Sequence, residues 1–377
     1  MNPSGSLNPS PRTLEVDSIA RFDRLVSAGA RAMHGWHAQS LDLRGRGAAL
    51  AALDAEGAVF LGCTFDPGVE ASLRSRGALI FPRLTGVPFN PYRAGLYTPQ
   101  ELYAGIVDEP YEKTPDGLVY QWSMRPGQRN RLDSTLAAAL HDHAVGDALE
   151  EFVRTLNSGG RSIVGVMGGH ALQRGTGGFA SAATLGRLLA RRGHLVATGG
   201  GPGAMEAANL GAYLSTADDD DFHGVLRELA AVPGFRPSVS AWARAAAAAV
   251  ERFPGGAASL GIPTWFYGHE PPNYFATHIA KYFANAVREA ILLEVCNGGI
   301  VFLPGAAGTV QEIFQDACEN YYGAPETMTP MVLVGREHWE QRFPAWPVLQ
   351  SLAAGRAMEQ RIFLVDSVDE ALGVLGG

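Results

Sequence analysis

The chain has 377 residues, of which 46% are hydrophobic and 18% charged, and its formal net charge is −8. This length suits two domains, or one large α/β domain with an extension. Only 30 residues are Lys or Arg and no long basic run occurs, which disfavours nucleic acid as a partner. Three widely spaced cysteines without a CxxC pair disfavour a zinc ribbon and a disulfide framework.

The first third of the chain carries few chemical signals. Residues 1–12, rich in Pro, Ser and Asn, are predicted to be a disordered tail, and they lack the basic and apolar regions of a signal peptide. No uncharged apolar stretch approaches about 18 residues, so we expect no membrane partner and a cytoplasmic protein. Residues 13–132 form an N-terminal module of unknown role, with short strands predicted at 57–65 and 77–84.

From residue 133 to residue 377, helical and strand-like segments alternate. After a helix at 133–156, strands are predicted at 162–169, 194–201, 261–267, 299–305, 330–335 and 361–366. Helices are predicted at 179–193, 202–214, 276–295, 309–323 and 367–375. Apolar strands without alternation, separated by helices, indicate a parallel sheet covered on both faces. The predicted fold class is therefore α/β, a doubly wound, Rossmann-like domain that follows an N-terminal mixed extension or small domain.

Glycine-rich turns end three of the predicted strands, at Gly168-Gly169, at 199–201 and at Pro304-Gly305. In parallel sheets, ligands bind beyond the carboxyl ends of the strands, where the strand order reverses. His170 follows the first turn and could contact a ligand or lie at the surface. His269 and Glu270 begin a proline-rich loop that we expect to face the same region. The acidic run 218–221 is interpreted as a helix N-terminus rather than a metal site.

The first long glycine loop, TGGGPGAMEAAN, spans residues 198–209. Glycines let a backbone approach a ligand closely, and the start of a helix offers free N–H groups to an anion. A tight connection between a strand and a helix would need the same small residues, so the sequence leaves both interpretations open. The loop lacks the spacing of a dinucleotide fingerprint.

The second loop, PGAAGTVQE, spans residues 304–312 and contains no P-loop lysine. That absence argues against a nucleoside triphosphatase and for a ligand with fewer phosphates. Glu312 has two possible roles. With Thr309 it forms the T-x-x-E pattern of a capping box, in which each side chain satisfies a backbone N–H. Alternatively, its carboxylate lies at the mouth of an anion site, beside the sugar of a bound nucleotide.

Together the two loops resemble the motifs of the Lonely Guy (LOG) family, GGGxxGxMxxA followed by PGGxGTxxE, especially those of its larger bacterial members. The matching residues are Gly199, Gly200, Gly201, Gly203 and Met205, then Pro304, Gly305, Ala306, Ala307, Gly308, Thr309 and Glu312. Arg288 resembles the arginine that the family carries on the helix before the second motif. Ala306 replaces a motif glycine, which would cost on the order of 1 kcal/mol if that position needed positive φ. The resemblance covers residues 160–335.

The resemblance implies a nucleotide-binding domain and hydrolysis of a nucleoside 5′-monophosphate to free base and ribose 5-phosphate, without metal or cofactor. Glu312 and Arg288 would be catalytic, and the motif glycines with Met205, 306–309, Gly168 and Gly169 would bind the nucleotide. His170, His269 and Glu270 would add contacts, and the protein would be a homodimer. A sensor or carrier that binds a nucleotide or a pterin cofactor without cleaving it stays the alternative. A DNA-processing protein with a related domain is disfavoured by the acidic charge.

Overall fold

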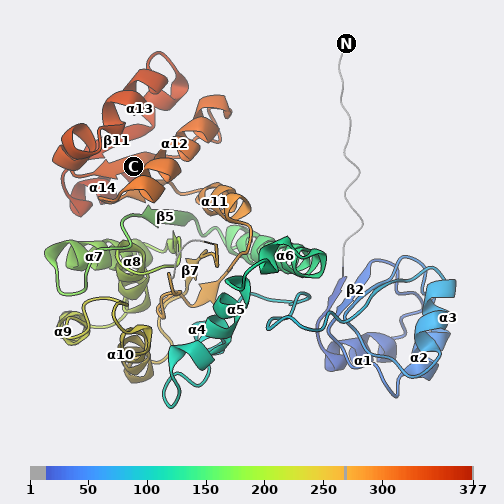
Figure 1. Ribbon diagram of the computed structural model, residues 1–377. Coiled ribbons are helices and arrows are strands. Elements are labelled where there is room, and N and C mark those ends of the chain that lie inside the picture. Colours follow the sequence, from blue (N-terminus) through green and yellow to red (C-terminus); the bar gives the residue numbers. More distant parts are fainter. Residues whose placement is uncertain (1–13, 267–269, 376–377) are drawn as a thin grey trace, which may run out of the picture. The chain divides into compact units, whose positions relative to one another are not determined.

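The computed structural model describes residues 14–266 and 270–375 (Figure 1). The predicted tail, residues 1–12, and the predicted contact His269 lie outside these ranges. The chain divides into two compact units. The first contains the residues up to Gly95 together with Leu132–Ala144, and the second contains Leu96–Arg131 and Val145–Gly377. Residues 96–131, which the sequence pattern placed in the N-terminal module, therefore group with the second unit.

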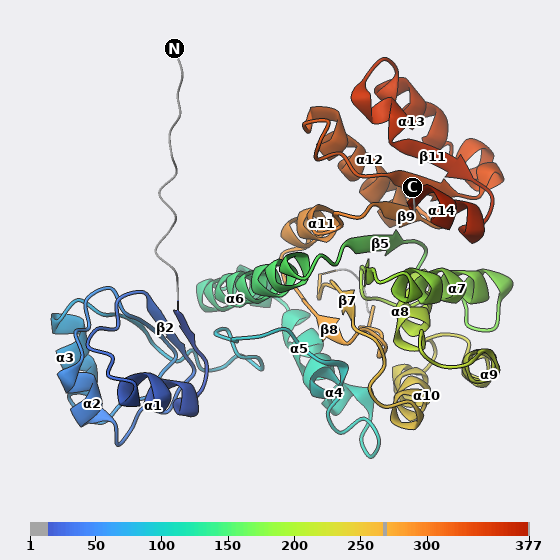
Figure 2. The same ribbon diagram turned by 180° about the vertical axis from the view of Figure 1, so that it is seen from behind.

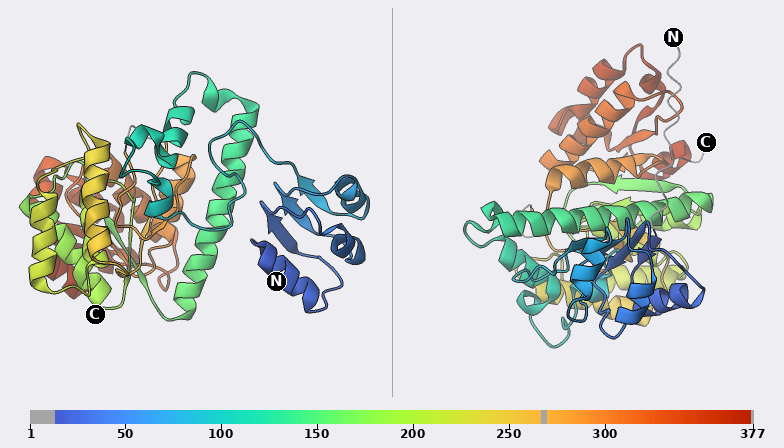
Figure 3. Two further views of the ribbon diagram at one scale, coloured as in Figure 1. Left: turned by 90° about the horizontal axis from the view of Figure 1, so that it is seen from below. Right: turned by 90° about the vertical axis from the view of Figure 1, so that its right-hand side faces the viewer.

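A repeated strand-and-helix motif builds the first unit. Its four parallel strands follow the order β1-β2-β3-β4, and Figure 3 shows them in blue beside helices α1–α3. Leu14 pairs with Trp36, His37 with Val59 and Val59 with Leu79, a repeat of about 22 residues. The elements are β1 (Leu14–Val16), α1 (Ile19–Ser27), β2 (Trp36–Gln39), α2 (Gly47–Ala52), β3 (Val59–Leu61), α3 (Val69–Ser75) and β4 (Leu79–Phe81).

Register explains how this unit forms its core. Val16, Ala38, Phe60 and Ile80 are aligned across the four strands and are all buried. Phe22, Leu50 and Leu73, one from each helix, complete the same hydrophobic cluster. One apolar column on the strands and one apolar position on each helix therefore hold successive repeats together. The two strands predicted in this region, within 57–65 and 77–84, correspond to β3 and β4.

The second unit is a seven-stranded parallel sheet with the order β11-β10-β9-β5-β6-β7-β8. Its strands are β5 (Ile163–Met167), β6 (Leu195–Thr198), β7 (Ser259–Gly261), β8 (His278–Ile279), β9 (Ile300–Phe302), β10 (Met331–Val334) and β11 (Ile362–Val365). Its helices are α4 (Pro99–Leu102), η1 (Tyr111–Lys113), α5 (Pro115–Ser123), η2 (Gln128–Asn130), α7 (Gly177–Arg191), α8 (Ala204–Tyr213), α9 (Asp219–Leu229), α10 (Val239–Arg252), α11 (Asn285–Glu294), α12 (Ala307–Tyr322), η3 (His338–Arg342), α13 (Ala345–Ala353), η4 (Ala357–Gln360) and α14 (Val368–Leu375). Helix α6 (Leu132–Ser158) begins in the first unit and ends in the second.

Strand order reverses between β5 and β9 (Figure 2). From β5 the chain builds outward through β6 and β7 to β8, and from β9 it builds the other way through β10 to β11. Right-handed crossovers in opposite directions put the connecting helices on opposite faces of the sheet. Accordingly α14 returns to contact α7, whereas α12 contacts both α11 and α13. The predicted doubly wound α/β fold is confirmed. No helix in the described ranges combines the length and the apolarity that a bilayer crossing requires.

One predicted helix is wrong over its first half. The pattern predicted a helix across 276–295, but α11 begins at Asn285, and β8 lies in the preceding segment. There the amide of Ala280 donates to the carbonyl of Gly261, and Ile279 exchanges backbone hydrogen bonds with Tyr97. Partners on two sides satisfy this backbone in an extended conformation, so tertiary pairing overrides the local helical preference. The neighbouring strand, predicted at 261–267, instead ends at Gly261.

Candidate functional site

The switch point between β5 and β9 brings the three glycine turns together. The amide of Gly169 donates to the carbonyl of Pro304 at 3.2 Å, and the amide of Ala204 donates to the carbonyl of Gly169 at 3.1 Å. A Cβ on Gly203 would lie only 2.5 Å from the oxygen of Gly169. The turns after β5, β6 and β9 are therefore in contact at the sheet edge where ligands of this fold bind.

Within the first glycine loop, two glycines serve the strand-to-helix connection. Gly200 and Gly203 have φ of 71° and 74°, a region that residues with a Cβ rarely adopt. The side-chain amide of Asn273 donates to the carbonyl of Gly201 at 3.2 Å, and its backbone amide donates to that of Gly200 at 2.8 Å. The loop is buried beneath this segment. The turn between β6 and α8 therefore explains why glycine occupies these two positions.

The other two glycines make room for side chains. A Cβ on Gly199 would lie 2.8 Å from Sδ of Met205 and 3.3 Å from Nη2 of Arg288. A Cβ on Gly201 would lie 3.5 Å from Oε2 of Glu270. Gly199 therefore leaves room for Met205 and for the Arg288 guanidinium, and Gly201 leaves room for the end of the Met205 side chain, whereas a Cβ on Gly201 would only touch Glu270.

Helix α12 begins directly after the second loop, and its geometry excludes the capping-box role of Glu312. Ala306 is the N-cap residue and makes no side-chain cap hydrogen bond. Thr309 is the third residue of the helix, so the reciprocal bonds of a capping box do not form. Ala306 has φ of −124°, so alanine carries no penalty for positive φ at this position. Ala306, Ala307 and Gly308 are exposed, and the first amides of a helix lack partners within the helix.

His338, from η3, is a site residue that the sequence interpretation missed. Its Nε2 atom lies 2.8 Å from the carbonyl oxygen of Gly305 and 3.2 Å from its amide nitrogen. One tautomer donates to the carbonyl, and the other accepts from the amide. Because β10 ends at Val334 on the edge of the sheet where the loops meet, a histidine shortly after that strand could have been recognised as a candidate.

Arg288 and Glu312 meet in a buried cluster. Nη1 of Arg288 lies 2.6 Å from Oε2 of Glu289 and 3.9 Å from Oε1 of Glu312. Nε of Arg288 has no hydrogen-bond partner within the described residues. Burial raises the pKa of Glu312 to about 8, against the effect of Arg288 and with smaller contributions from Glu289 and Glu270. Glu312 therefore holds its proton to a higher pH than an exposed glutamate does.

A second buried carboxyl group follows on the same helix. Asp316 lies one turn beyond Glu312, is 4% exposed, and its Oδ2 has no hydrogen-bond partner among the described residues. Burial, with a smaller contribution from Glu319, raises the pKa of Asp316 to about 8. Sequence analysis did not identify Asp316, because an isolated acidic residue in a helix gives no signal of burial.

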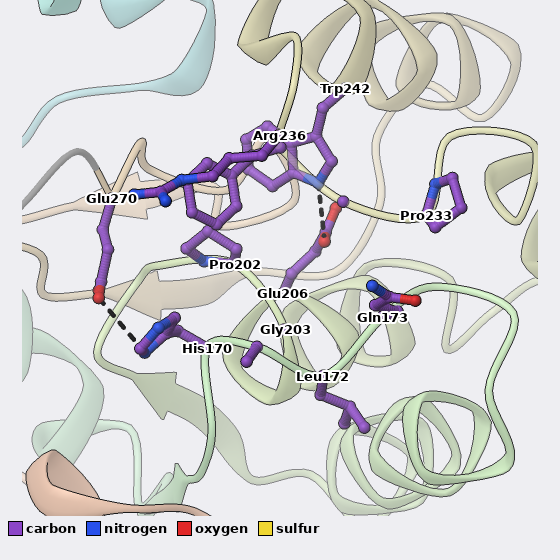
Figure 4. A pocket seen from close by; sticks show the side chains of 13 residues that line it. His170, Leu172, Gln173, Pro202, Gly203, Glu206, Pro233, Arg236, Trp242 and Glu270 are labelled. Carbon is purple, nitrogen blue, oxygen red and sulfur yellow. Dashed lines mark hydrogen bonds and ion pairs between the residues drawn. The ribbon is translucent and has the colours of Figure 1, made fainter.

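A pocket of about 460 Å³ adjoins the first glycine loop (Figure 4). Its walls come from the loop after β5, from Pro202 and Gly203, from residues 233–236 and from Trp242 of α10. Nδ1 of His170 and Oε1 of Glu270 lie 3.3 Å apart at its edge. Arg288 and Glu312 are not among the described residues that line this pocket.

One wall of this pocket is fixed by a buried ion pair. Glu206, from the first motif, accepts from Nε of Arg174 at 3.0 Å and from Nε1 of Trp242 at 3.1 Å. The Arg174 guanidinium also lies 5.1 Å from the centre of the Trp242 ring. Both ionic side chains are 1% exposed. These contacts tie α8 and α10 to the loop after β5, so the motif glutamate has a structural role here.

Solved structures of known proteins give weak overall likenesses. They include the molybdenum cofactor binding protein of Rippkaea orientalis (15% identity, TM-score 0.36) and the Moco carrier protein of Chlamydomonas reinhardtii (19%, 0.35), each covering 57% of this chain and 96% of its own. Another, the structural genomics target TM1055, has 19% identity and a TM-score of 0.36 and covers 57% of this chain and 98% of its own. No curated protein matches the sequence significantly.

A family model gives a match on the sequence itself. The SLOG cluster4 family matches residues 161–217, the segment that contains β5, α7, β6, the first glycine loop and α8. The match covers the first of the two predicted motifs, whereas the second motif (residues 304–312) and Arg288 lie outside it. Residues 161–217 are therefore similar to the SLOG cluster4 family, which supports the resemblance predicted from the first glycine loop.

Proposed function

We propose that the protein hydrolyses the N-glycosidic bond of a nucleoside 5′-monophosphate to free base and ribose 5-phosphate. The observation that carries this proposal is the meeting of Arg288 and Glu312. They come from two different helices and both are buried, and Arg288 also lies against Gly199 of the first glycine loop. A carboxyl group with a strongly raised pKa beside a charged partner at a ligand-binding edge is typical of an acid–base catalyst.

The N-terminus of α12 would bind the phosphate. Residues 306–308 are exposed at the start of a helix of 16 residues, whose dipole favours an anion. The amide of Gly305 is within hydrogen-bond distance of His338, so a phosphate would either replace that bond or use the tautomer that releases the amide. Without a lysine in the loop, the site suits one phosphate better than a triphosphate.

Glu312 would act first as an acid and then as a base. The C1′–N bond breaks with its electron pair moving to the base, which takes the proton of the Glu312 carboxyl group. The resulting carboxylate stabilises the positive charge on the sugar. Water then forms the new C1′–O bond and returns a proton to Glu312. Arg288 would orient the carboxyl group and moderate its pKa, since it opposes the effect of burial.

A binding protein for a nucleotide or a pterin cofactor, without cleavage, is the second candidate. One observation favours it: Glu312 does not line the pocket beside the loop, so a ligand held only there would not contact the carboxyl group. Incubation with a panel of nucleoside monophosphates, followed by chromatographic separation of free bases, tests the proposal. Base release that is lost in Glu312→Gln supports the hydrolase. Tight binding of a monophosphate or a pterin with no base released supports the carrier.

A further inference from the structure

The pocket beside the first glycine loop has walls and a rim of different chemistry. Leu172 and Phe235 provide partly exposed apolar surface, with the buried Pro202 and Trp242 beside them, and the exposed Gln173 and Arg236 provide polar groups. A volume of about 460 Å³ lies within the range of small-molecule sites, which combine apolar walls with a few placed polar groups. Because Trp242 is held by Glu206 and Arg174, its wall is rigid before any ligand arrives.

Arg236 is the polar group that distinguishes this pocket. Its guanidinium lies 5.6 Å from the centre of the Phe235 ring, and Figure 4 shows it extending towards Glu270. It makes no hydrogen bond or ion pair within the part of the chain that the structure describes. Arginine offers only donors, so its natural partner is a pair of adjacent acceptors. On a purine, O6 and N7 of a 6-oxo base are such a pair, whereas adenine presents a donor beside N7.

Glu270 connects the pocket with the proposed catalytic carboxyl group. One of its oxygens pairs with His170 at the pocket edge, and the other lies 3.5 Å from the position of a Cβ on Gly201. Its charge also acts on Glu312. A base in the pocket would therefore place its sugar at Glu270 and its glycosidic bond towards Glu312, with the phosphate at α12.

We propose that this pocket binds the base of the nucleotide and that Arg236 selects a 6-oxopurine, so that guanosine and inosine monophosphates are preferred over adenosine monophosphate. This assignment rests on the proposed function for its substrate class, but it can be measured by binding alone. It assigns a role to residues 233–236 and α10, which neither glycine motif includes.

The test measures binding of GMP, AMP and ribose 5-phosphate by calorimetry to wild type and to Arg236→Gln. Wild type should bind GMP more tightly than AMP. Because a bidentate contact from arginine to a purine discriminates by roughly tenfold to a hundredfold, the variant should lose about that factor for GMP. Its affinity for AMP and ribose 5-phosphate should change little. Arg227→Gln, at an exposed position on α9 outside the pocket, is the matched control and should bind like wild type.

The outcomes separate this assignment from the proposed reaction. If wild type releases base but Arg236→Gln has the same ratio of GMP to AMP affinity as wild type, the assignment of the pocket is wrong. The proposed reaction is then still supported. Selective loss of GMP affinity with no base released by wild type supports the pocket and rejects the hydrolase. The assignment is also overturned if wild type binds ribose 5-phosphate but binds GMP and AMP with equal affinity. Failure of all three ligands to bind overturns both proposals.

Discussion

Arg288 lies closer to Glu289 than to Glu312, with nitrogen–oxygen distances of 2.6 Å and 3.9 Å. At 3.9 Å, Arg288 lowers the pKa of Glu312 without offsetting the effect of burial. This arrangement lets burial dominate and keeps the Glu312 carboxyl group protonated.

Glu312→Gln tests the catalytic role. Gln is neutral and similar in shape to the protonated acid, so the fold should be retained, but it cannot donate or recover the proton. We expect turnover to fall by roughly 10²–10⁴, measured as base released per unit time. Gln311→Glu, at the neighbouring position, restores a carboxyl group at the wrong place and should not rescue the variant. Wild-type turnover in Glu312→Gln would contradict the mechanism.

The raised pKa values also predict how stability varies with pH. The ordinary pKa values are 4.5 for Glu312 and 3.8 for Asp316, and burial raises both to about 8. Between these limits the folded protein holds protons that the unfolded chain has lost, so the free energy of unfolding falls as pH rises towards 8. Above about 8 these two groups cause little further loss.

Replacing either group by its amide should remove its share of that pH dependence. Thermal unfolding of Glu312→Gln and Asp316→Asn, followed by circular dichroism from acid to alkaline pH, measures the effect. The Tm of each variant should exceed that of wild type by an amount that grows with pH and levels off above about 8. A constant difference across the whole pH range would show that the carboxyl groups titrate normally.

Phosphate recognition at α12 predicts a large gap between nucleotides and nucleosides. A charged hydrogen bond contributes about 1.5–3 kcal/mol, and the first amides of a helix lack partners within the helix, so α12 could offer the phosphate several such bonds. Guanosine should therefore bind at least about a hundredfold more weakly than its 5′-monophosphate in a calorimetric titration. The 3′-monophosphate is the control, because it has the same charge at another position. Equal affinity for guanosine and GMP would show that the N-terminus of α12 does not bind the phosphate.

The ion pair of Arg174 and Glu206 gives a prediction about stability alone. Both groups are 1% exposed, so Glu206→Gln leaves a buried guanidinium without its counterion. We expect the free energy of unfolding to fall by about 3–5 kcal/mol, measured by urea denaturation. Arg154→Gln breaks the pair with Glu150 at the surface of α6 and should leave stability nearly unchanged. A Glu206→Gln protein as stable as wild type would contradict this account.

The sequence predicted the parts of the fold that local chemistry determines. Buried parallel strands, glycine turns and the helices between them carry their own patterns, so the doubly wound sheet and the meeting of its loops followed from residue order. The start of α12 was harder to predict from the sequence. Thr309 and Glu312 have the spacing of a capping box, but the helix starts at Ala307, and only the backbone shows that.

Burial and long-range pairing were beyond the reach of the pattern. Asp316 and His338 gain their significance from neighbours on other elements. In β8, Ile279 is extended because Tyr97, far away in sequence, pairs with it. The repeat of the first unit is visible in the sequence at one kind of position. Gly35, Gly57 and Gly77 precede successive strands, and each has a positive φ. Their spacing could have revealed the repeat.

That repeat has a consequence for how the first unit can change. Each strand pairs only with the strands of adjacent repeats, so the stability of such an array is approximately a sum over neighbouring units. Insertion or deletion of one complete repeat between β1 and β4 would leave every remaining interface of the same kind. Evolution can therefore lengthen or shorten this unit in steps of one repeat, independently of the residues that form the candidate site.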